Sequence, residues 1–263
     1  MFYYIIASSL FLISIIIINI LATSLKPLLF SRYPIPFLII LIVITLTFAY
    51  IYQRKGVGAG RNITRKLHPD ESRKKYLLTF DDGPSIEWTP RIIEILSENN
   101  LKAIFFVVGK EAEEHPDIIR KMDEMGMEIG VHSYSHKPLP FLFTGGIRQE
   151  IENTADAIRE ITGKSPRYFR PPWGLYNKEV LDIAGGNGMK TILWSRSSID
   201  WKESDPGKIR NNVIEKMLAE EILLFHDGCK KGASRGPTVK ALPVIIEELG
   251  ALGFSPAGLE YIQ

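Results

Sequence analysis

The sequence predicts an α/β protein built from parallel strands that alternate with crossover helices. Short apolar runs and segments of helical periodicity take turns through residues 76–263 without an internal repeat, which is typical of parallel sheets. Polar residues capable of acid–base or metal chemistry follow these runs directly, where the carboxyl ends of parallel strands meet. Two apolar stretches without any charge precede this region and indicate a separate, non-globular part of the chain.

Residues 1–56 predict a membrane anchor of two transmembrane helices. The stretches 2–25 and 34–52 carry no charged residue, and about 20 apolar residues are enough to cross a hydrocarbon core as a helix. A cleaved signal peptide fits less well, because no basic residue precedes the first stretch, which is also longer than a usual signal core. Two buried core helices are the other alternative, and the length of the charge-free runs argues against them. Residues 57–75 combine glycines with a charged stretch and predict a flexible tether to the large domain at 76–263.

The composition argues against nucleic-acid binding and excludes an intrachain disulfide. The chain has 263 residues, a formal net charge of +2 and no basic block interleaved with aromatic residues, so nothing supports nucleic-acid binding. The single cysteine, Cys229, cannot form an intrachain disulfide. It lies shortly after His226, and we interpret it as an unreactive loop thiol rather than a metal ligand.

The elements of the large domain follow from its apolar runs and their periodicity. The first strand is expected at 76–80, before the turn Gly83-Pro84, and further strands at 103–108, 128–131, 168–169, 191–194 and 222–225. Helices are expected at 90–99, 116–125, 146–162, 177–184, 206–218 and 238–249. Pro206 suits the first turn of its helix, and Asp205 suits the cap. This order gives roughly six or seven strand–helix units, which fits a barrel of fewer than eight units or an open sheet.

Five groups of polar residues lie shortly after expected strands. They are Asp81-Asp82, His132-Ser-Tyr-Ser-His136, Arg170-Pro-Pro-Trp173, Asp200-Trp201 and His226-Asp227. In a parallel α/β fold these strand ends converge on one mouth, so we expect one shared site. For the first group alone, a solvated turn is the alternative, and the other four groups weaken it.

The spacing of two histidines suggests a metal site. His132 and His136 are four residues apart, which on one turn of helix would place both imidazoles on one face. Such a pair alone is more often two surface or core histidines. Asp82 would complete a two-histidine, one-carboxylate site with open positions for water. Asp81 is then free to act as a base toward that water.

The remaining polar residues suggest roles around such a metal. Arg170 could hold Asp81 in place and keep it ionised, or it could form a structural salt bridge. His226 could act as a general acid, because the reference pKa of histidine lies near neutrality.

An apolar wall is expected beside these polar groups. Trp173, Trp201 and Leu224 could line a small acyl pocket, although each of them alone is more often a core residue. The two prolines before Trp173 could direct its amide N–H toward a developing oxyanion.

Taken together, these motifs resemble the polysaccharide deacetylase family, also called carbohydrate esterase family four. The resemblance rests on Thr79-Phe-Asp-Asp-Gly-Pro84, His132-Ser-Tyr-Ser-His136, Arg170-Pro-Pro-Trp173, Asp200-Trp201 and Leu224-Phe-His226, in the family's order. It implies a distorted barrel of seven strand–helix units. It also implies a divalent metal, usually zinc, with cobalt or nickel as alternatives. The implied reaction is removal of N-acetyl groups from N-acetylglucosamine-type residues of a polysaccharide, with cell-wall peptidoglycan as the first expectation.

The family's functional residues carry over position by position. Asp81 matches the catalytic base, Arg170 the residue that orients it, and His226 the acid. Asp82, His132 and His136 match the metal ligands.

One departure from the family pattern is expected at Ser197. We interpret this serine as standing where the family has an acid that tunes the catalytic histidine. Since a hydroxyl cannot stabilise imidazolium by charge, the pKa of His226 is expected to be lower than in a site with the acid.

Two other functions use some of the same residues. A membrane-anchored glycan-binding protein with a degenerate site would explain Ser197. A non-haem iron oxygenase shares the ligand set Asp82, His132 and His136. The intact base, arginine and acid favour hydrolysis over both.

The location of the large domain rests on opposing observations. Basic residues follow the second apolar stretch and, counted alone, would place the domain inside the cell. A cell-wall polymer lies outside, and large domains cross membranes largely regardless of charge. We therefore expect a multi-pass protein of the cell membrane with an external catalytic domain. Protease added to intact cells should then cleave residues 57–75.

Overall fold

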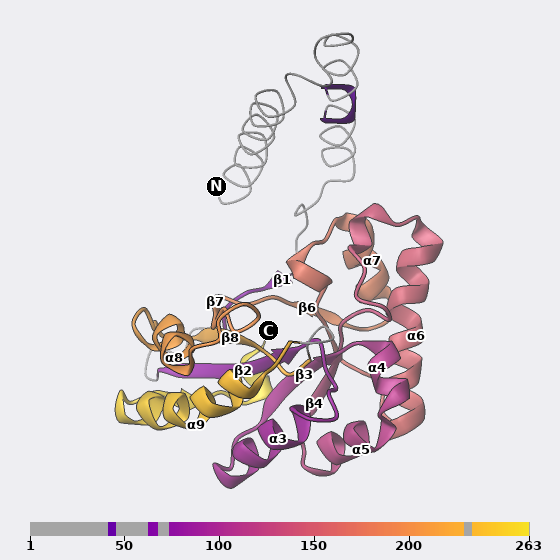
Figure 1. The fold of residues 1–263 in the computed structure, drawn as a ribbon. Coiled ribbons are helices and arrows are strands. Elements are labelled where there is room, and N and C mark those ends of the chain that lie inside the picture. The colour runs from indigo at the N-terminus through magenta and orange to yellow at the C-terminus, as the bar shows by residue number, and fades with distance from the viewer. Residues whose placement is uncertain (1–41, 46–62, 68–73, 229–232, 263) are drawn as a thin grey trace, which may run out of the picture. The chain divides into compact units, whose positions relative to one another are not determined.

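The computed structural model describes residues 42–45, 63–67, 74–228 and 233–262 (Figure 1). The chain divides into two units, Met1–Ala59 and Gly60–Gln263. In the first unit only residues 42–45 are described, and they are helical. Apart from these four residues, the predicted spans at 2–25 and 34–52 lie outside the described residues. Within the described ranges, no helix is both long and apolar enough to cross a membrane.

The second unit is built on one curled sheet whose named strands all pair in parallel. In the described residues the order across it is β1-β6-β5-β4-β3-β2-β8-β7, and β9 pairs with β2. The strands are β1 Ile63–Thr64, β2 Lys75–Asp81, β3 Ala103–Val107, β4 Glu128–Val131, β5 Tyr168–Phe169, β6 Lys190–Ile192, β7 Arg196–Ser197, β8 Glu221–His226 and β9 Ser255–Pro256. The α/β class is confirmed, and the curled parallel sheet is consistent with a distorted barrel of seven units.

Helices surround the outer side of this sheet (Figure 1). They are α3 Thr89–Glu98, α4 Gly109–Glu114, α5 Pro116–Glu124, α6 Thr144–Thr162, α7 Lys178–Gly186, α8 Pro206–Ile214 and α9 Gly236–Ala251. Short 3₁₀ turns occur at Leu139–Phe141, Pro172–Gly174 and Leu259–Tyr261. The predicted cap of α8 is confirmed, since the Asp205 carboxylate accepts a hydrogen bond from the Gly207 N–H at 2.8 Å. Helix α4 was not predicted, because its single buried apolar side chain, Ala112, gives no periodic stripe.

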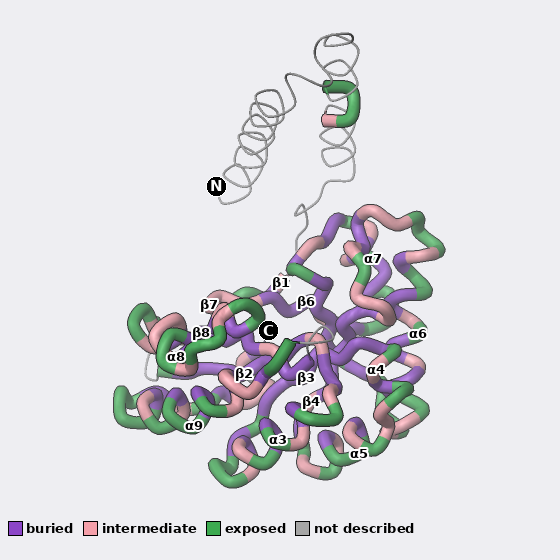
Figure 2. Tube along the Cα trace, in the orientation of Figure 1, coloured by how far each residue is buried: buried purple, intermediate pink, exposed green. Residues whose placement is uncertain are grey.

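Alternation along β2 decides which side chains can reach the site. Tyr76, Leu78 and Phe80 belong to the large core between sheet and helices, whereas Leu77 belongs to a smaller core inside the curl. Because successive side chains point to opposite faces, Asp81 lies on the inner face with Leu77. Figure 2 shows β2 and β3 buried along their length, while the helices keep exposed outer faces.

Within the predicted tether at 57–75, the described residues 63–67 belong to the sheet and are not a loose linker. Residues 63–64 pair with β6, and the Thr64 carbonyl accepts from the Leu193 N–H at 2.8 Å. Lys66 then bridges to Glu221 at the start of β8, and Leu67 is buried in the inner core. The segment 63–67 therefore links the β6 and β8 sides of the curled sheet. Its two apolar side chains, Ile63 and Leu67, show no pattern in the sequence, and only packing against the folded sheet buries them.

Candidate metal and catalytic site

The predicted site residues converge at the carboxyl ends of the strands. Asp81 at the end of β2 is the register partner of His226 at the end of β8. His132 follows β4, and Arg170 follows β5 beside it, with the Arg170 N–H donating to the Val131 carbonyl at 2.9 Å. Parallel strands thus bring residues distant in sequence to one edge, as the motif positions predicted.

A tight backbone turn separates the two aspartates. Asp82 adopts a left-handed φ of 76°, so the chain reverses at the strand end and its side chain leaves the β2 pleat. A Cβ at Gly83 would lie 2.0 Å from the Asp227 carboxylate, and one at Gly228 would lie 1.9 Å from the Asp82 carbonyl oxygen. Only glycine fits at either position, and the close packing fixes where Asp81 and Asp82 point.

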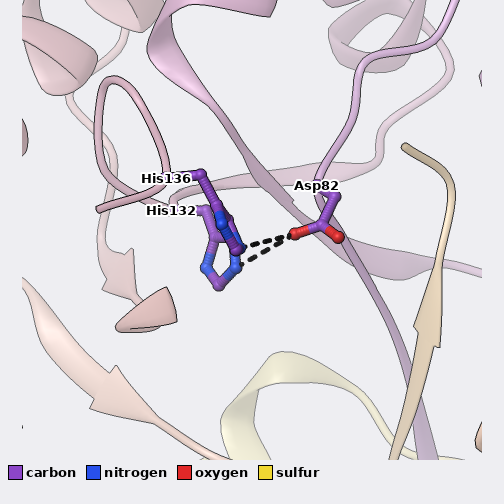
Figure 3. Close-up of side chains that lie close together, drawn as sticks. All are labelled: Asp82, His132 and His136. Carbon is purple, nitrogen blue, oxygen red and sulfur yellow. Dashed lines mark ion pairs between the residues drawn. The ribbon is translucent and has the colours of Figure 1, made fainter. Parts of the chain in front are cut away.

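Asp82, His132 and His136 form a group of three ligand side chains (Figure 3). The Asp82 Oδ1 lies 3.0 Å from His136 Nε2 and 3.4 Å from His132 Nε2. Burial raises the pKa of Asp82, but its contacts with the two histidines lower it more, so the net shift of that pKa is well downward. The three donors fit a divalent cation, because a carboxylate and two imidazoles are ligands that zinc and similar metals accept.

The Arg170 backbone sets the tautomer of the first histidine. The Arg170 carbonyl oxygen lies 2.7 Å from His132 Nδ1, and because a carbonyl can only accept a hydrogen bond, Nδ1 is the ring nitrogen that carries the proton. The lone pair of His132 is then at Nε2, on the side of Asp82. Such a partner on the second ring nitrogen is the usual way of orienting a metal-binding histidine.

The expectation that His132 and His136 share a helical turn is wrong. Residues 132–136 form a loop in which Ser133 and His136 have left-handed φ angles of 66° and 52°. The four-residue spacing brings the two rings together through this loop, with centroids 5.2 Å apart. The three predicted side chains do lie together, but a loop rather than a helical turn brings them there.

Arg170 is fully buried and holds Asp81. Its Nη1 donates to Asp81 Oδ1 at 2.7 Å and to the Thr79 hydroxyl at 2.8 Å. Its Nε and Nη2 donate to the carbonyl oxygens of Ile192 and Leu193, each at 3.0 Å. Burial lowers the pKa of Arg170, and the charge of Asp81 opposes this shift. The pair is therefore both a buried salt bridge and an orienting contact for a carboxylate at the site.

Asp200, rather than position 197, supplies the acid beside His226. The Asp200 Oδ1 lies 2.7 Å from His226 Nδ1, and its Oδ2 accepts from the His226 backbone N–H at 2.9 Å. Burial lowers the pKa of His226, but the charge and hydrogen bond of Asp200 raise it more, so the net shift is upward. The premise that Ser197 leaves His226 without an acid partner is wrong, because Asp200 makes the contact assigned to position 197. The Ser197 hydroxyl instead accepts from the Ile199 N–H at 3.2 Å.

Two residues at the N-terminal end of helix α9, Arg235 and Thr238, hold Asp200 in place. Thr238 donates its hydroxyl to Asp200 Oδ2 at 2.9 Å, and buried Arg235 donates to the Asp200 carbonyl at 2.9 Å. Arg235 also donates to the Gly228 carbonyl at 2.7 Å. These contacts were missed from sequence, since nothing in the pattern of α9 distinguishes a site-facing threonine from a core one.

The three predicted apolar residues separate into two kinds. Trp173 is 53% exposed and Trp201 is 57% exposed, so neither is a core residue, whereas Leu224 is buried at 4%. The Trp173 ring meets the His136 ring edge-on, with centroids 4.4 Å apart. Trp173 therefore lies directly beside the ligand group.

Asp227 is a further buried acid, and the sequence analysis assigned it no structural role beside the site. It accepts a hydrogen bond from the Thr89 hydroxyl at 2.6 Å, and burial raises its pKa to about 7. Its backbone N–H donates to the Asp81 carbonyl at 3.1 Å. Its position directly after His226 was the available signal.

Comparison with known sequences gives concordant matches. A sequence model of the family described as polysaccharide deacetylase matches residues 68–192. The peptidoglycan-N-acetylglucosamine deacetylase of Bacillus cereus is 33% identical over 182 residues, which cover 69% of this chain and 66% of that protein. A chitooligosaccharide deacetylase of a Bradyrhizobium species is 31% identical over 201 residues, covering 73% of this chain and 92% of that protein.

Comparison with solved structures gives both active and inactive relatives. The Bc1960 peptidoglycan N-acetylglucosamine deacetylase matches with a TM-score of 0.70 and 31% identity, over 74% of this chain and 90% of that chain. A CE4 family pseudoenzyme from Bacillus anthracis matches with a TM-score of 0.69 and 30% identity, over 75% of this chain and 67% of that chain. Overall similarity therefore does not separate enzymes from pseudoenzymes, and the residues of the site must do so.

Proposed function

Because this chain belongs to the polysaccharide deacetylase family of N-deacetylases, we propose that it hydrolyses N-acetyl groups on N-acetylglucosamine-type residues of a polysaccharide in a metal-dependent reaction. Cell-wall peptidoglycan is the first substrate to test, since it is the substrate named for the Bacillus cereus relative. Asp82, His132 and His136 would hold the metal, with zinc first and cobalt or nickel as alternatives. When bound, a divalent metal supplies Lewis-acid polarisation of the acetyl carbonyl and lowers the pKa of water.

The buried Asp81–Arg170 pair is the observation that carries this proposal. A metal-binding protein without hydrolytic chemistry needs only the three ligands. Here a second carboxylate lies beside them, with Asp81 Oδ2 3.8 Å from His132 Nε2 and Oδ1 held by Arg170. A fixed carboxylate at this place can take the proton of an attacking water. The same pair has no evident use in the oxygenase alternative.

The second half of the reaction needs an acid for the departing amine. His226 can donate that proton from Nε2, because Asp200 holds Nδ1 and stabilises the imidazolium. The Trp173 amide N–H is proposed as a donor to the developing oxyanion, and Trp173, Trp201 and Leu224 as the walls around the acetyl group.

Acetate release by the full-length protein tests the proposal. The protein is stripped with a chelator, reloaded with zinc or cobalt, and given peptidoglycan or chitin oligosaccharides. Metal-dependent release supports the deacetylase and ranks the substrates. Glycan binding without release by a folded, metal-loaded protein would favour the alternative of a glycan-binding protein with a degenerate site. The alternative has to be tested because one similar structure is described as a pseudoenzyme of the CE4 family.

Replacing Asp200 with asparagine should shift the pH dependence of turnover. His226 must be protonated to act as the acid, so activity falls as pH rises through its pKa. Asp200 raises that pKa, and its charge is lost in Asp200→Asn, so the alkaline limb of the kcat profile should move to lower pH. We also expect kcat to fall on the order of 100-fold, as when a general acid is disabled.

Ser197→Asp is the matched control for this shift. The described hydrogen bonds of Ser197 do not include His226, so a new carboxylate there should leave the alkaline limb in place. An unmoved limb in Asp200→Asn, or a limb raised by Ser197→Asp, would contradict the assignment of Asp200.

We also propose a multi-pass protein of the cell membrane, anchored through residues 1–56, with the catalytic domain outside. The support is the apolar sequence at 2–25 and 34–52 together with the external location of peptidoglycan. Protection of the domain from protease in intact cells, with cleavage only after lysis, would reverse this orientation.

A further inference from the structure

The loop 132–136 has one well-anchored end and one end that depends on a distant helix. His132 is fixed by its ring contact with the Arg170 carbonyl and by its own N–H, which donates to the Val107 carbonyl at 2.9 Å. His136 lies at the other end, in a left-handed backbone conformation, and is partly exposed. Left-handed backbone at non-glycine residues is strained and persists only where surrounding contacts hold it.

Earlier in the loop the Ser133 and Tyr134 carbonyl oxygens accept hydrogen bonds from backbone N–H groups of helix α4. Next to His136 the contacts come from Glu150 on helix α6. Its Oε2 accepts from the Ser135 backbone N–H at 2.7 Å, and its Oε1 accepts from the Ser135 hydroxyl at 2.6 Å. Lys137 pairs with the same Oε1 at 3.1 Å from the exposed side of the loop. The Glu150 carboxylate thus binds both chain neighbours of His136, Ser135 and Lys137.

The placement of Glu150 in α6 is unusual for a charged residue. It lies within the buried stripe of the helix, with Ile147, Ile151 and Thr154, and is only 6% exposed. A buried carboxylate is costly unless its oxygens are satisfied, and here the loop satisfies them. Burial raises the pKa of Glu150, but the hydrogen bonds from Ser135 and the contact with Lys137 lower it by more. The net shift of the pKa is downward, so Glu150 stays ionised.

We propose that Glu150 is a positioning residue that holds His136 in its metal-binding orientation. The inference rests on the metal site of the proposed function. Losing the Glu150 contacts frees the Ser135 backbone, and the left-handed conformation of His136 then relaxes. The His136 Nε2 atom would no longer be held near Asp82, so the ligand group would have to be reordered at each binding event.

Metal affinity of the full-length protein carrying Glu150→Gln tests this proposal. A glutamine keeps the size but loses the negative charge that pairs with Lys137 and has only one oxygen to accept from Ser135. We expect Zn²⁺ affinity, measured by competition with a chelating dye, to fall on the order of 10- to 100-fold, as for other partners that orient metal ligands. The visible spectrum of the Co²⁺-loaded protein should also change, which loss of stability alone would not produce.

Glu152→Gln is the matched control on the same helix. Glu152 pairs with Arg148 at the surface, so its removal should leave metal affinity unchanged. If Glu150→Gln fails to fold, Ser135→Ala removes one of the two Ser135 bonds and should weaken binding several-fold. Wild-type affinity and spectrum in Glu150→Gln, or in Ser135→Ala where it is needed, would overturn the role of Glu150 alone. Absence of metal binding by the wild-type protein would overturn the proposed function as well.

Discussion

The variant His132→Ala is expected to lose metal binding and, with it, all measurable deacetylation. His132 offers Nε2 to the metal, and its Nδ1 partner orients that nitrogen. Removing the ligand itself should cost more than the roughly 100-fold loss seen when only an outer partner is removed. Metal content after dialysis and dye-competition affinity measure the first effect, and acetate release measures the second.

A stability measurement and the variant His136→Ala should accompany His132→Ala. Since His132 is 2% exposed, its removal leaves a cavity and could reduce the free energy of unfolding. His136→Ala removes a ligand whose side chain is 25% exposed, so it should lose metal with less effect on the fold.

His115→Ala is the matched control, because a second group of ligand side chains exists at Glu111, Glu114 and His115. If metal is lost in His115→Ala and kept in His132→Ala, the metal site has been assigned to the wrong group.

The variant Asp81→Asn should separate metal binding from chemistry. Asparagine cannot accept the proton of the attacking water, so kcat should fall about 10²- to 10⁴-fold. Asp81 is not one of the three ligand residues, so metal affinity should stay within a few-fold of wild type. Acetate release under saturating substrate and dye-competition affinity give the two values on one preparation.

A stability measurement must accompany Asp81→Asn. Arg170 is fully buried and loses its charged partner, although the asparagine oxygen can still accept from Nη1. Breaking a buried ion pair costs about 3–5 kcal/mol, so a lower Tm is expected and the assay temperature must lie below it. Asp156→Asn, which removes a surface partner of Arg159, should retain wild-type activity. Full turnover by Asp81→Asn would rule out Asp81 as the base.

The sequence was sufficient for the class of fold and for predicting which polar residues come together. Alternating apolar runs marked the strands, and each group of polar residues followed one of them. Asp81, Asp82, His132, His136, Arg170 and His226 do converge at one edge of the sheet. This works because the pleat and the parallel connections make strand ends meet whatever the intervening loops do.

The sequence misled where a role depends on a contact between distant segments. Ser197 is close to Asp200 in the chain, yet only the register of β7 and β8 decides which of them reaches His226. The segment 63–67 reads as a linker, yet an open side of the curled sheet makes it part of the barrel. Periodicity and spacing describe local structure and carry no information about either contact.

From the sequence alone, then, come the parallel α/β fold, the candidate metal-binding group Asp82, His132 and His136, and the pairing of Asp81, the proposed base, with Arg170. Only the tertiary structure assigns Asp200 to His226, Glu150 to the loop before His136, and a loop rather than a helix to the histidine pair. The physical reason is that residue type limits the chemistry a side chain can do, whereas its pKa, orientation and partners are set by groups that folding brings within about 3 Å.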